Sequence, residues 1–117
     1  MMINIVDDDE AVRDSLHMLL EELGHTVKTY ASAEPLLRGD WDCDCLLVDQ
    51  HMPGITGIDL LEYLRAKGDA TPAVLVSGGA NGEIIRRARH LAVPVLQKPV
   101  AENTLMDQIE NACRISG

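Results

Sequence analysis

The sequence contains no phenylalanine, only one tryptophan and only two tyrosines in 117 residues. The core must therefore be built from Leu, Ile, Val, Met and Ala, and hydrophobic residues do make up 46% of the chain. A domain of this length buries roughly 65% of the surface of its unfolded chain, which is enough for a hydrophobic core. The composition excludes a disordered tail, and the length predicts one domain.

Basic residues are also few. Ten Lys and Arg face nineteen Asp and Glu, which gives a formal charge of −9. Binding to nucleic acid requires clustered positive charge against phosphates, so we expect no nucleic-acid partner. The one dense basic group is RRAR at 86–89. We expect its arginines to face solvent on a helix whose inner side carries Ile84, Ile85 and Ala88.

The chain has no apolar run of the roughly 20 residues that span a bilayer, and we expect no membrane association. Its first ten residues, MMINIVDDDE, carry no Lys or Arg and end in four acids, unlike a signal peptide. Cys43, Cys45 and Cys113 are an odd number of cysteines, which favours reduced thiols. These absences predict a cytoplasmic protein.

Short apolar runs alternate with helical hydrophobic spacing along the whole chain. The runs predict strands at 3–6, 26–30, 45–48, 73–76 and 93–96. The spacing predicts helices at 10–23, 32–38, 57–67, 84–91 and 105–113. Strict alternation predicts an α/β fold with a five-stranded parallel sheet covered on both faces, in a flavodoxin-like, doubly wound (βα)5 arrangement.

Chemically distinctive residues follow four of these strands. Asp7 and Asp8 follow the first, Asp49 the third, Ser77 the fourth and Lys98 the fifth. Sites in open α/β sheets form outside the carboxyl ends of the strands, so these side chains should converge. Clustered carboxylates repel each other unless a cation joins them, and Mg²⁺ prefers oxygen ligands. Each residue alone is ordinary, but together they point to phosphoryl transfer with an aspartate nucleophile.

The sequence resembles the receiver domain of bacterial two-component response regulators. An Asp followed by Met-Pro-Gly, and a Lys-Pro after the fifth strand, are its most specific features. The resemblance rests on IVDDDEAVRDSL at 5–16, LLVDQHMPGITGIDLL at 46–61, AVLVSGGA at 73–80 and VPVLQKPV at 93–100. It covers residues 1–117 and implies one stand-alone receiver without an output domain.

The resemblance implies a role for each acidic residue of the site. Asp49 is implied as the phosphoacceptor. Asp7, Asp8 and Asp49 are implied as ligands of Mg²⁺ (or Mn²⁺), together with the backbone carbonyl of His51. Such a protein accepts a phosphoryl group and catalyses its own phosphorylation and dephosphorylation, but it is not a conventional enzyme.

The remaining site residues follow from the same resemblance. Ser77 and Lys98 are implied to bind the phosphoryl group, and the Lys98–Pro99 peptide bond is expected to be cis. Receivers often carry Tyr or Phe three residues before the lysine, whereas this chain has Val95 at that switch position, which has no ring to swing. We expect the glycine pair ending at Gly79 to make its loop mobile and to take over part of the switch.

The resemblance also implies partners. These are a sensor histidine kinase or phosphotransfer protein, and a downstream protein target. Dimerisation is left open, and a homodimer would form through the last two helices and the strand between them, or through the first and last helices. The side chain of His51 and Gly79 are further candidates that tune the lifetime of the phosphoryl group. Ala92 stands where a helix-ending glycine is favoured.

Three other functions compete with this interpretation. A pseudo-receiver would be an interaction module that is never phosphorylated, but all five site residues are intact. A haloacid-dehalogenase-like phosphatase would carry its nucleophile after the first strand, where Asp7-Asp8-Asp9 is followed by Glu10-Ala11. A flavodoxin-type FMN binder needs a phosphate-binding loop after that strand, and the acidic residues here would repel FMN.

Overall fold

The computed structural model describes residues 1–39 and 41–116, with side chains described through residue 112. It contains the ten alternating elements that the hydrophobic pattern predicts. The strands are β1 (Met2–Val6), β2 (Thr26–Tyr30), β3 (Cys45–Asp49), β4 (Ala73–Ser77) and β5 (Val95–Gln97). The helices are α1 (Glu10–Glu22), α2 (Ala33–Arg38), α3 (Gly57–Ala66), α4 (Gly82–His90) and α5 (Glu102–Ser116).

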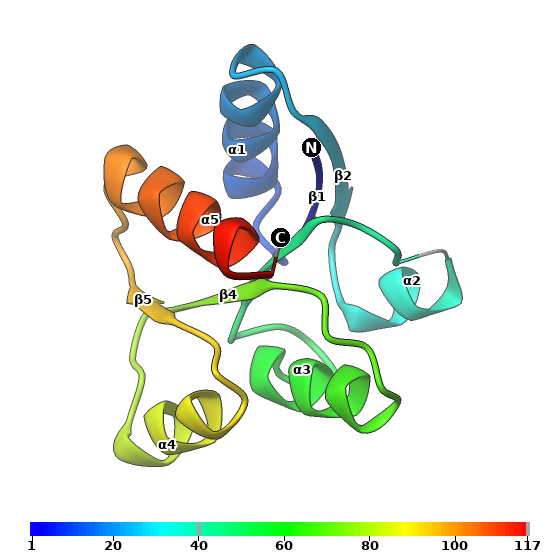
Figure 1. Cartoon of the computed structure of the whole chain (residues 1–117), viewed down its shortest axis with the longest axis vertical. Helices are drawn as coiled ribbons and strands as arrows, with labels where there is room; N and C mark the ends of the chain where they lie inside the picture. The colour runs from blue at the N-terminus through cyan, green and yellow to red at the C-terminus, as the bar shows by residue number, and fades with distance from the viewer. Residues whose placement is uncertain (40, 117) are drawn as a thin grey trace.

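The five strands form one parallel sheet in the order β2-β1-β3-β4-β5. The order reverses between β1 and β3, where Ile3 pairs with Cys45 and Val6 with Val48. Helices α1 and α5 cover one face of the sheet, and α2, α3 and α4 cover the other (Figure 1). This arrangement confirms the predicted α/β, flavodoxin-like fold. The switch point lies at the carboxyl ends of β1 and β3, where the candidate site is expected.

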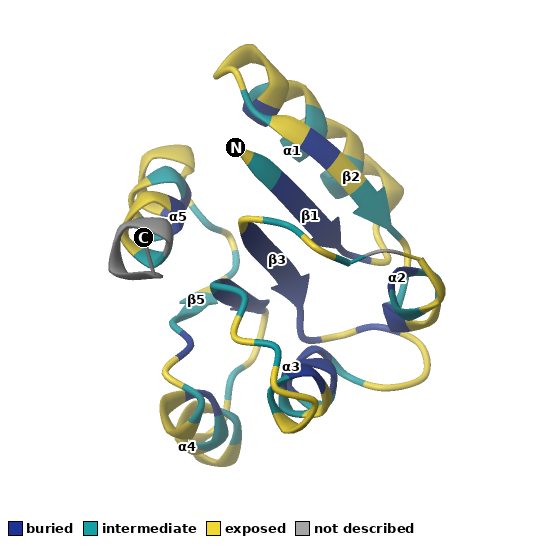
Figure 2. Ribbon diagram, turned by 45° about the vertical axis from the view of Figure 1, so that its right-hand side comes forward, coloured by how far each residue is buried: buried dark blue, intermediate teal, exposed yellow. Residues whose placement is uncertain are grey.

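The sheet separates two hydrophobic cores. On one side, Leu20 of α1 and Ile109 of α5 pack against alternate residues of the strands. On the other side, Leu36 of α2 and Leu61 of α3 do the same. Strands β3 and β4 are buried along their entire length, and the helices turn their exposed residues outward (Figure 2). Both faces of the central strands are therefore covered, as parallel sheets require.

Helix ends follow local sequence signals. Asp9 caps α1 by accepting hydrogen bonds from the amides of Ala11 and Val12. Gly24 follows the end of this helix with a φ of 92°. Ala92 adopts a φ of 58° just after α4, so the backbone there has the left-handed conformation that glycine favours. The expectation for Ala92 is confirmed.

Three details of the pattern were wrong. The last strand begins at Val95 instead of residue 93, because Pro94 has no amide hydrogen to give to the sheet. The first helix is predicted to extend to residue 23, but Leu23 lies beyond its last turn and is 54% exposed. Ile85 was placed on the inner side of α4, but it is 41% exposed.

Arg87 does not face solvent freely, contrary to expectation. Its guanidinium Nη2 lies 2.7 Å from Asp59 Oδ1 of α3 and also pairs with Glu62. A second donor, Nε, lies 3.1 Å from Glu62 Oε2. Hydrogen bonds from Arg87 lower the pKa of both carboxyl groups below their ordinary values. Arg87 therefore links α4 to α3, a contact that the spacing within one helix cannot reveal.

We expect Arg87→Met to reduce the free energy of unfolding by about 1 kcal/mol at neutral pH, the upper range for partly exposed ion pairs. The folded pKa values of Asp59 and Glu62 are lowered, so this stabilisation is complete above their unfolded pKa values. It is lost as the pH falls through the folded values. Urea unfolding at several pH values measures this, and Arg86→Met, on the exposed side of α4, is the matched control. An equal loss at low pH would contradict the ion-pair explanation.

The cysteines lie away from the carboxyl ends of the strands. Neither Cys43 nor Cys45 forms a disulfide among the described residues, and the side chain of Cys113 lies outside them. Burial raises the pKa of the Cys43 thiol to about 12, so it stays protonated at neutral pH.

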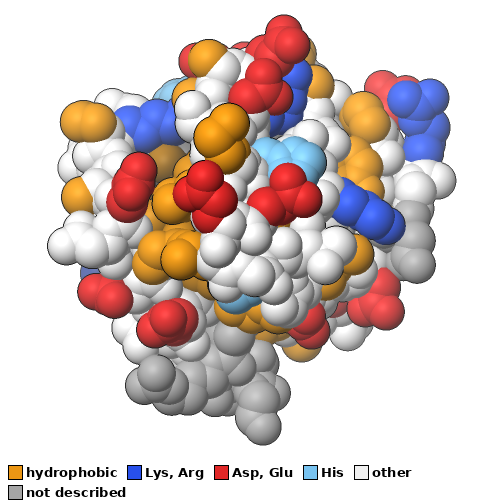
Figure 3. Space-filling model, turned by 90° about the horizontal axis from the view of Figure 1, so that it is seen from above, with side chains coloured by type: hydrophobic (Ala, Val, Ile, Leu, Met, Phe, Trp, Pro, Cys, Tyr) orange, Lys and Arg blue, Asp and Glu red, His pale blue; other side chains and the backbone are white. Residues whose placement is uncertain are grey.

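The surface reflects the acidic composition. Figure 3 shows Asp and Glu side chains spread among hydrophobic ones on the face at the top of Figure 1, with few Lys or Arg. In residues 1–39 and 41–116, no helix is both long and apolar enough to cross a membrane.

Candidate functional site

Three carboxylates meet at the switch point of the sheet. Asp7 follows β1 and is 5% exposed, and Asp49 ends β3 and is 3% exposed, whereas Asp8 is exposed. Ligand oxygens of all three lie within 4.8 Å of one another. The parallel register that pairs Val6 with Val48 brings these residues together. The predicted convergence of the three carboxylates is therefore observed.

Lys98 joins this cluster from the end of β5. Its Nζ lies 3.2 Å from Asp49 Oδ1 and 3.7 Å from Asp7 Oδ2. Burial lowers the pKa of Lys98, but the charges of Asp49, Asp7 and Asp8 outweigh burial and raise it above its ordinary value. The ammonium group therefore stays charged and neutralises part of the acidic cluster.

The cluster fits a hard divalent cation. Burial raises the pKa of Asp7, and the charge of Asp49 raises it further, although a hydrogen bond from the Asp9 amide opposes both. One ammonium group thus leaves the carboxylates in excess. Oδ1 of Asp49 is buried, and Lys98 Nζ at 3.2 Å is its charged neighbour. Close carboxylates with one exposed member are a donor set that suits Mg²⁺ with several waters retained.

Ser77 ends β4 and is fully buried. Its Oγ accepts a hydrogen bond from the Gly79 amide at 3.2 Å, so the hydroxyl is engaged by its own loop. Its carbonyl accepts a hydrogen bond from the Lys98 amide at 2.9 Å, which fixes the loop that carries the lysine. The φ angle of Gly79 is not positive, unlike that of Gly24, Gly54 and Gly68. The mobility of its loop stays a prediction.

Gln50 is a residue of the site that the sequence analysis missed. It directly follows Asp49 and is 4% exposed. Its side-chain Oε1 accepts a hydrogen bond from the Ile58 amide at 2.8 Å, and its carbonyl accepts one from Gly57 at 3.1 Å. Gln50 thereby holds the first turn of α3 against the end of β3. The sequence feature that could have identified Gln50 is its position, as a polar residue directly after a buried strand.

Gly57 allows α3 to approach the end of β3 closely. A Cβ atom at this position would lie 2.5 Å from the backbone oxygen of Asp49 and 2.8 Å from Leu75 Cδ1. Both distances are shorter than side chains tolerate, and the first involves backbone that cannot turn away. The glycine therefore sets the spacing between helix and site.

The other predicted residues take different places. The Lys98–Pro99 peptide bond is cis, as expected. His51 is exposed beside the cluster, and its proposed roles in metal binding and lifetime stay predictions. Val95 lies on β5, half-buried and outside the carboxylate cluster. Arg13, which the sequence analysis did not select, donates a hydrogen bond to the Asp7 carbonyl at 2.7 Å.

Comparisons with known proteins agree with this geometry. Residues 3–110 match the family model of the response regulator receiver domain, and the chain belongs to that family. It is 34% identical to the transcriptional regulatory protein FixJ of Bradyrhizobium diazoefficiens, over 96% of this chain and 56% of that protein. It is 32% identical to the response regulator protein TmoT of Ectopseudomonas mendocina, over 98% and 54%. The chain thus spans about half the length of these curated relatives.

Solved structures lead to the same family. A CheY-like response regulator receiver domain from Methanospirillum hungatei superposes with a TM-score of 0.89 and 26% identity, covering 97% of this chain and 94% of that one. A receiver domain is a signalling module rather than a conventional enzyme. The membership favours phosphorelay signalling over the pseudo-receiver, phosphatase and FMN-binding alternatives.

Proposed function

We propose that residues 1–117 act as one receiver domain that accepts a phosphoryl group on Asp49 from a histidine kinase or a phosphotransfer protein. The observation that carries this proposal is the buried carboxylate of Asp49, which has Lys98 Nζ at 3.2 Å and two further carboxylates beside it. This combination supplies a nucleophile, a cation for the developing charge and ligands for a metal ion.

The transfer is an in-line displacement at phosphorus, with the attacking oxygen opposite the leaving nitrogen. A carboxylate oxygen of Asp49 attacks the phosphorus of a phosphohistidine, the new P–O bond forms as the P–N bond breaks, and the imidazole leaves with the electron pair. Lys98 neutralises charge on the carboxylate and then on the phosphoryl oxygens. Water later hydrolyses the acyl phosphate and regenerates Asp49. Ser77 gives up its contact with Gly79 and donates to the phosphoryl group.

Asp7, Asp8 and Asp49 would hold Mg²⁺ (or Mn²⁺), with the His51 carbonyl as a further ligand. When bound, the ion supplies positive charge to the oxygens of the transferred group. The two aspartates after β1 differ in burial and therefore in role. Asp7 is buried and positions its neighbours, whereas Asp8 is exposed and can replace its bound water with a metal ion. Phosphoryl acceptance should therefore depend on Asp8 and on the metal together.

We expect Asp8→Asn to slow phosphorylation by acetyl phosphate roughly a hundredfold in the presence of Mg²⁺, the size of effect typical for one lost electrostatic contact. Removal of Mg²⁺ with EDTA should slow the wild-type protein by at least as much. Intact-mass spectrometry follows the phosphorylated fraction over time. Asp107→Asn, an exposed acid on α5, is the matched control and should leave the rate unchanged. Equal rates with and without Mg²⁺ would overturn the proposed metal site.

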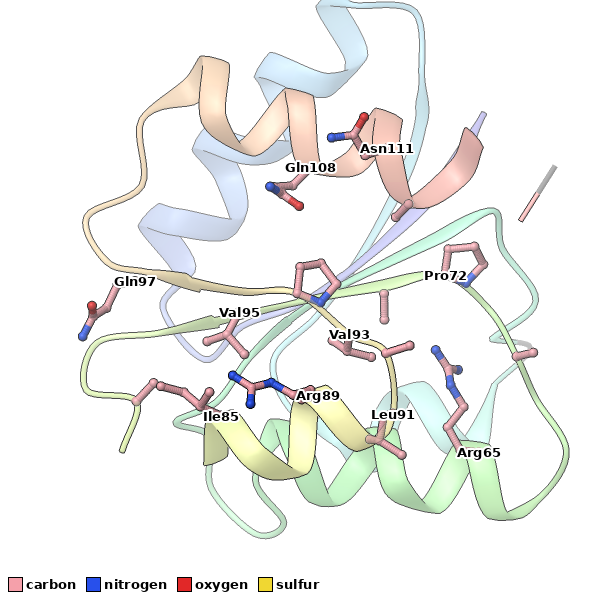
Figure 4. A pocket seen from close by; sticks show the side chains of 16 residues that line it. Arg65, Pro72, Ile85, Arg89, Leu91, Val93, Val95, Gln97, Gln108 and Asn111 are labelled. Carbon is pink, nitrogen blue, oxygen red and sulfur yellow. The ribbon is translucent and has the colours of Figure 1, made fainter. Parts of the chain in front are cut away.

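The phosphorylated protein passes its signal to a protein partner or to a second copy through α4, β5 and α5. A cavity of about 940 Å³ opens between these elements (Figure 4). Arg89 of α4 and Arg65 of α3 line it together with Val95, opposite Gln108 of α5. None of its described lining residues is an Asp or Glu, although the chain carries nineteen. Its charge suits an acidic partner surface.

Because Val95 has no aromatic ring, phosphorylation must change this surface by a movement other than the rotation of a ring. The Val95 side chain lines the cavity beside Ile85, which is 41% exposed on α4. A shift of the loop after Ser77 moves the start of α4, and Ile85 lies in its first turn. Movement of the loop with Gly79, instead of rotation of a ring, then carries the phosphorylation state to the partner surface.

A further inference from the structure

A second cavity lies between α1, α5 and the sheet, directly beneath the phosphoacceptor. Its volume is about 450 Å³, within the range of small-molecule sites. Its aliphatic walls come from two helices and the sheet, since Val12 and Leu16 belong to α1, Leu47 to β3 and Leu105 to α5. Leu47 and Leu105 are 3% and 4% exposed, so this surface is continuous with the hydrophobic core.

The cavity exists because no large side chain fills it. The chain has no phenylalanine, and its three aromatic residues, Tyr30, Trp41 and Tyr63, are not among the lining residues. Val100 occupies the position where the chain turns from the cis Lys98–Pro99 bond into α5, and it too lines the cavity. An apolar cavity of even about 150 Å³ takes up a benzene-sized molecule, so this one has room for a ligand of more than six carbons.

Only one end of the cavity is polar. Asp7 and Asp49 contribute carboxylates there, each more than nine-tenths buried, and Lys98 contributes one ammonium group. Lys98 Nζ lies 3.2 Å from Asp49 Oδ1 and 3.7 Å from Asp7 Oδ2, so one positive charge is shared by two carboxylates. Two carboxylates against one ammonium favour a cationic head group over an anionic one. The rest of the lining is apolar, apart from the backbone, and offers no site for a second charge.

We propose that this cavity binds a small hydrophobic primary amine, with its ammonium group at Asp7 and Asp49 and its carbon chain between α1 and α5. The ligand and a divalent cation would use the same carboxylates, so each weakens the binding of the other by the same factor. The site would thus make phosphorylation sensitive to amphiphilic amines. Binding itself requires neither metal nor phosphoryl donor, so it is independent of the proposed function.

The experiment is a titration of the ¹⁵N-labelled protein with n-hexylamine at neutral pH without Mg²⁺, followed by amide NMR shifts. We expect saturable shifts at Val12, Leu16 and Leu105. Binding of n-butylamine should be about fifteenfold weaker, because it lacks two methylenes and each contributes about fourfold, equivalent to about 0.8 kcal/mol. Hexanoate and 1-hexanol test the head group and should bind at least tenfold more weakly than hexylamine. Added Mg²⁺ should raise the apparent Kd of hexylamine.

Cavity-filling variants locate the site. Val100→Phe places a ring in the cavity and should reduce hexylamine affinity at least tenfold, while Leu23→Phe, which adds a ring at the exposed end of α1, should leave it unchanged. Val12→Phe serves the same purpose if the first variant does not fold. Unchanged affinity in the folded cavity-filling variant, or equal affinity for hexylamine and butylamine, would overturn the proposal. Phosphorylation by acetyl phosphate, measured separately, reports on the proposed function alone.

Discussion

We expect Asp49→Asn to abolish phosphorylation by acetyl phosphate. The amide has nearly the shape of the carboxylate, but it lacks the negative oxygen that attacks phosphorus. Asp49 is 3% exposed, and its Oδ1 lies 3.2 Å from Lys98 Nζ, closer than the 3.7 Å between Asp7 Oδ2 and the same ammonium group. The expected result is complete loss of the phosphoryl mass increment in intact-mass spectra, rather than a slower reaction.

The comparison requires a control for folding and for charge. Asp107→Asn removes the same charge from an exposed position on α5 and should be phosphorylated like the wild type. The circular dichroism spectrum and urea midpoint of Asp49→Asn show whether the fold is retained. Persistence of the mass increment in folded Asp49→Asn would contradict the assignment and direct attention to Asp7 or Asp8.

Gly57→Ala should be strongly destabilising although it adds a single methyl group. The new Cβ would meet the Asp49 backbone oxygen at 2.5 Å, so either α3 or the end of β3 must shift. Overpacking of this kind costs about 1–3 kcal/mol, and we expect the upper end because the obstacle is backbone. Displacement of Asp49 should also slow its phosphorylation. Urea unfolding measures the first effect and acetyl phosphate labelling the second.

Gly82→Ala is the matched control for this substitution. Gly82 is the first residue of α4, as Gly57 is of α3, but a Cβ there would meet no atom within 4 Å. Alanine favours a helix over glycine by up to about 1 kcal/mol, so Gly82→Ala should leave stability unchanged or raise it. Similar losses for both variants would show that helix starts in general are sensitive, and would contradict the role assigned to close packing against Asp49.

The sequence was sufficient to predict the fold and the position of the carboxylate cluster. Buried strands in a parallel sheet are unbroken apolar runs, and the residue that ends each run is at the sheet edge by geometry. Asp7, Asp49 and Lys98 could therefore be placed together without knowing any distance. The cis bond before Pro99 came from family resemblance alone, because proline by itself makes it a minority outcome.

What the sequence could not predict depends on contacts between elements. The pairing of Arg87 with Asp59 and Glu62 joins residues more than twenty positions apart, and helical spacing describes one helix at a time. Gln50 was missed because its partner is an amide of the next helix, a group that every residue carries. The cavity beside Val100 follows from the sum of volumes in three dimensions, which the absence of phenylalanine only hinted at.

Asp49 is proposed to carry the phosphoryl group, and locating that group in the wild-type protein tests this assignment. After reaction with acetyl phosphate and Mg²⁺, reduction with borohydride converts an aspartyl phosphate to homoserine, which tandem mass spectrometry of the proteolysed protein identifies by position. We predict homoserine at residue 49 and at no other aspartate. Homoserine at Asp7 or Asp8, or a phosphoryl group found on His51, would contradict the account.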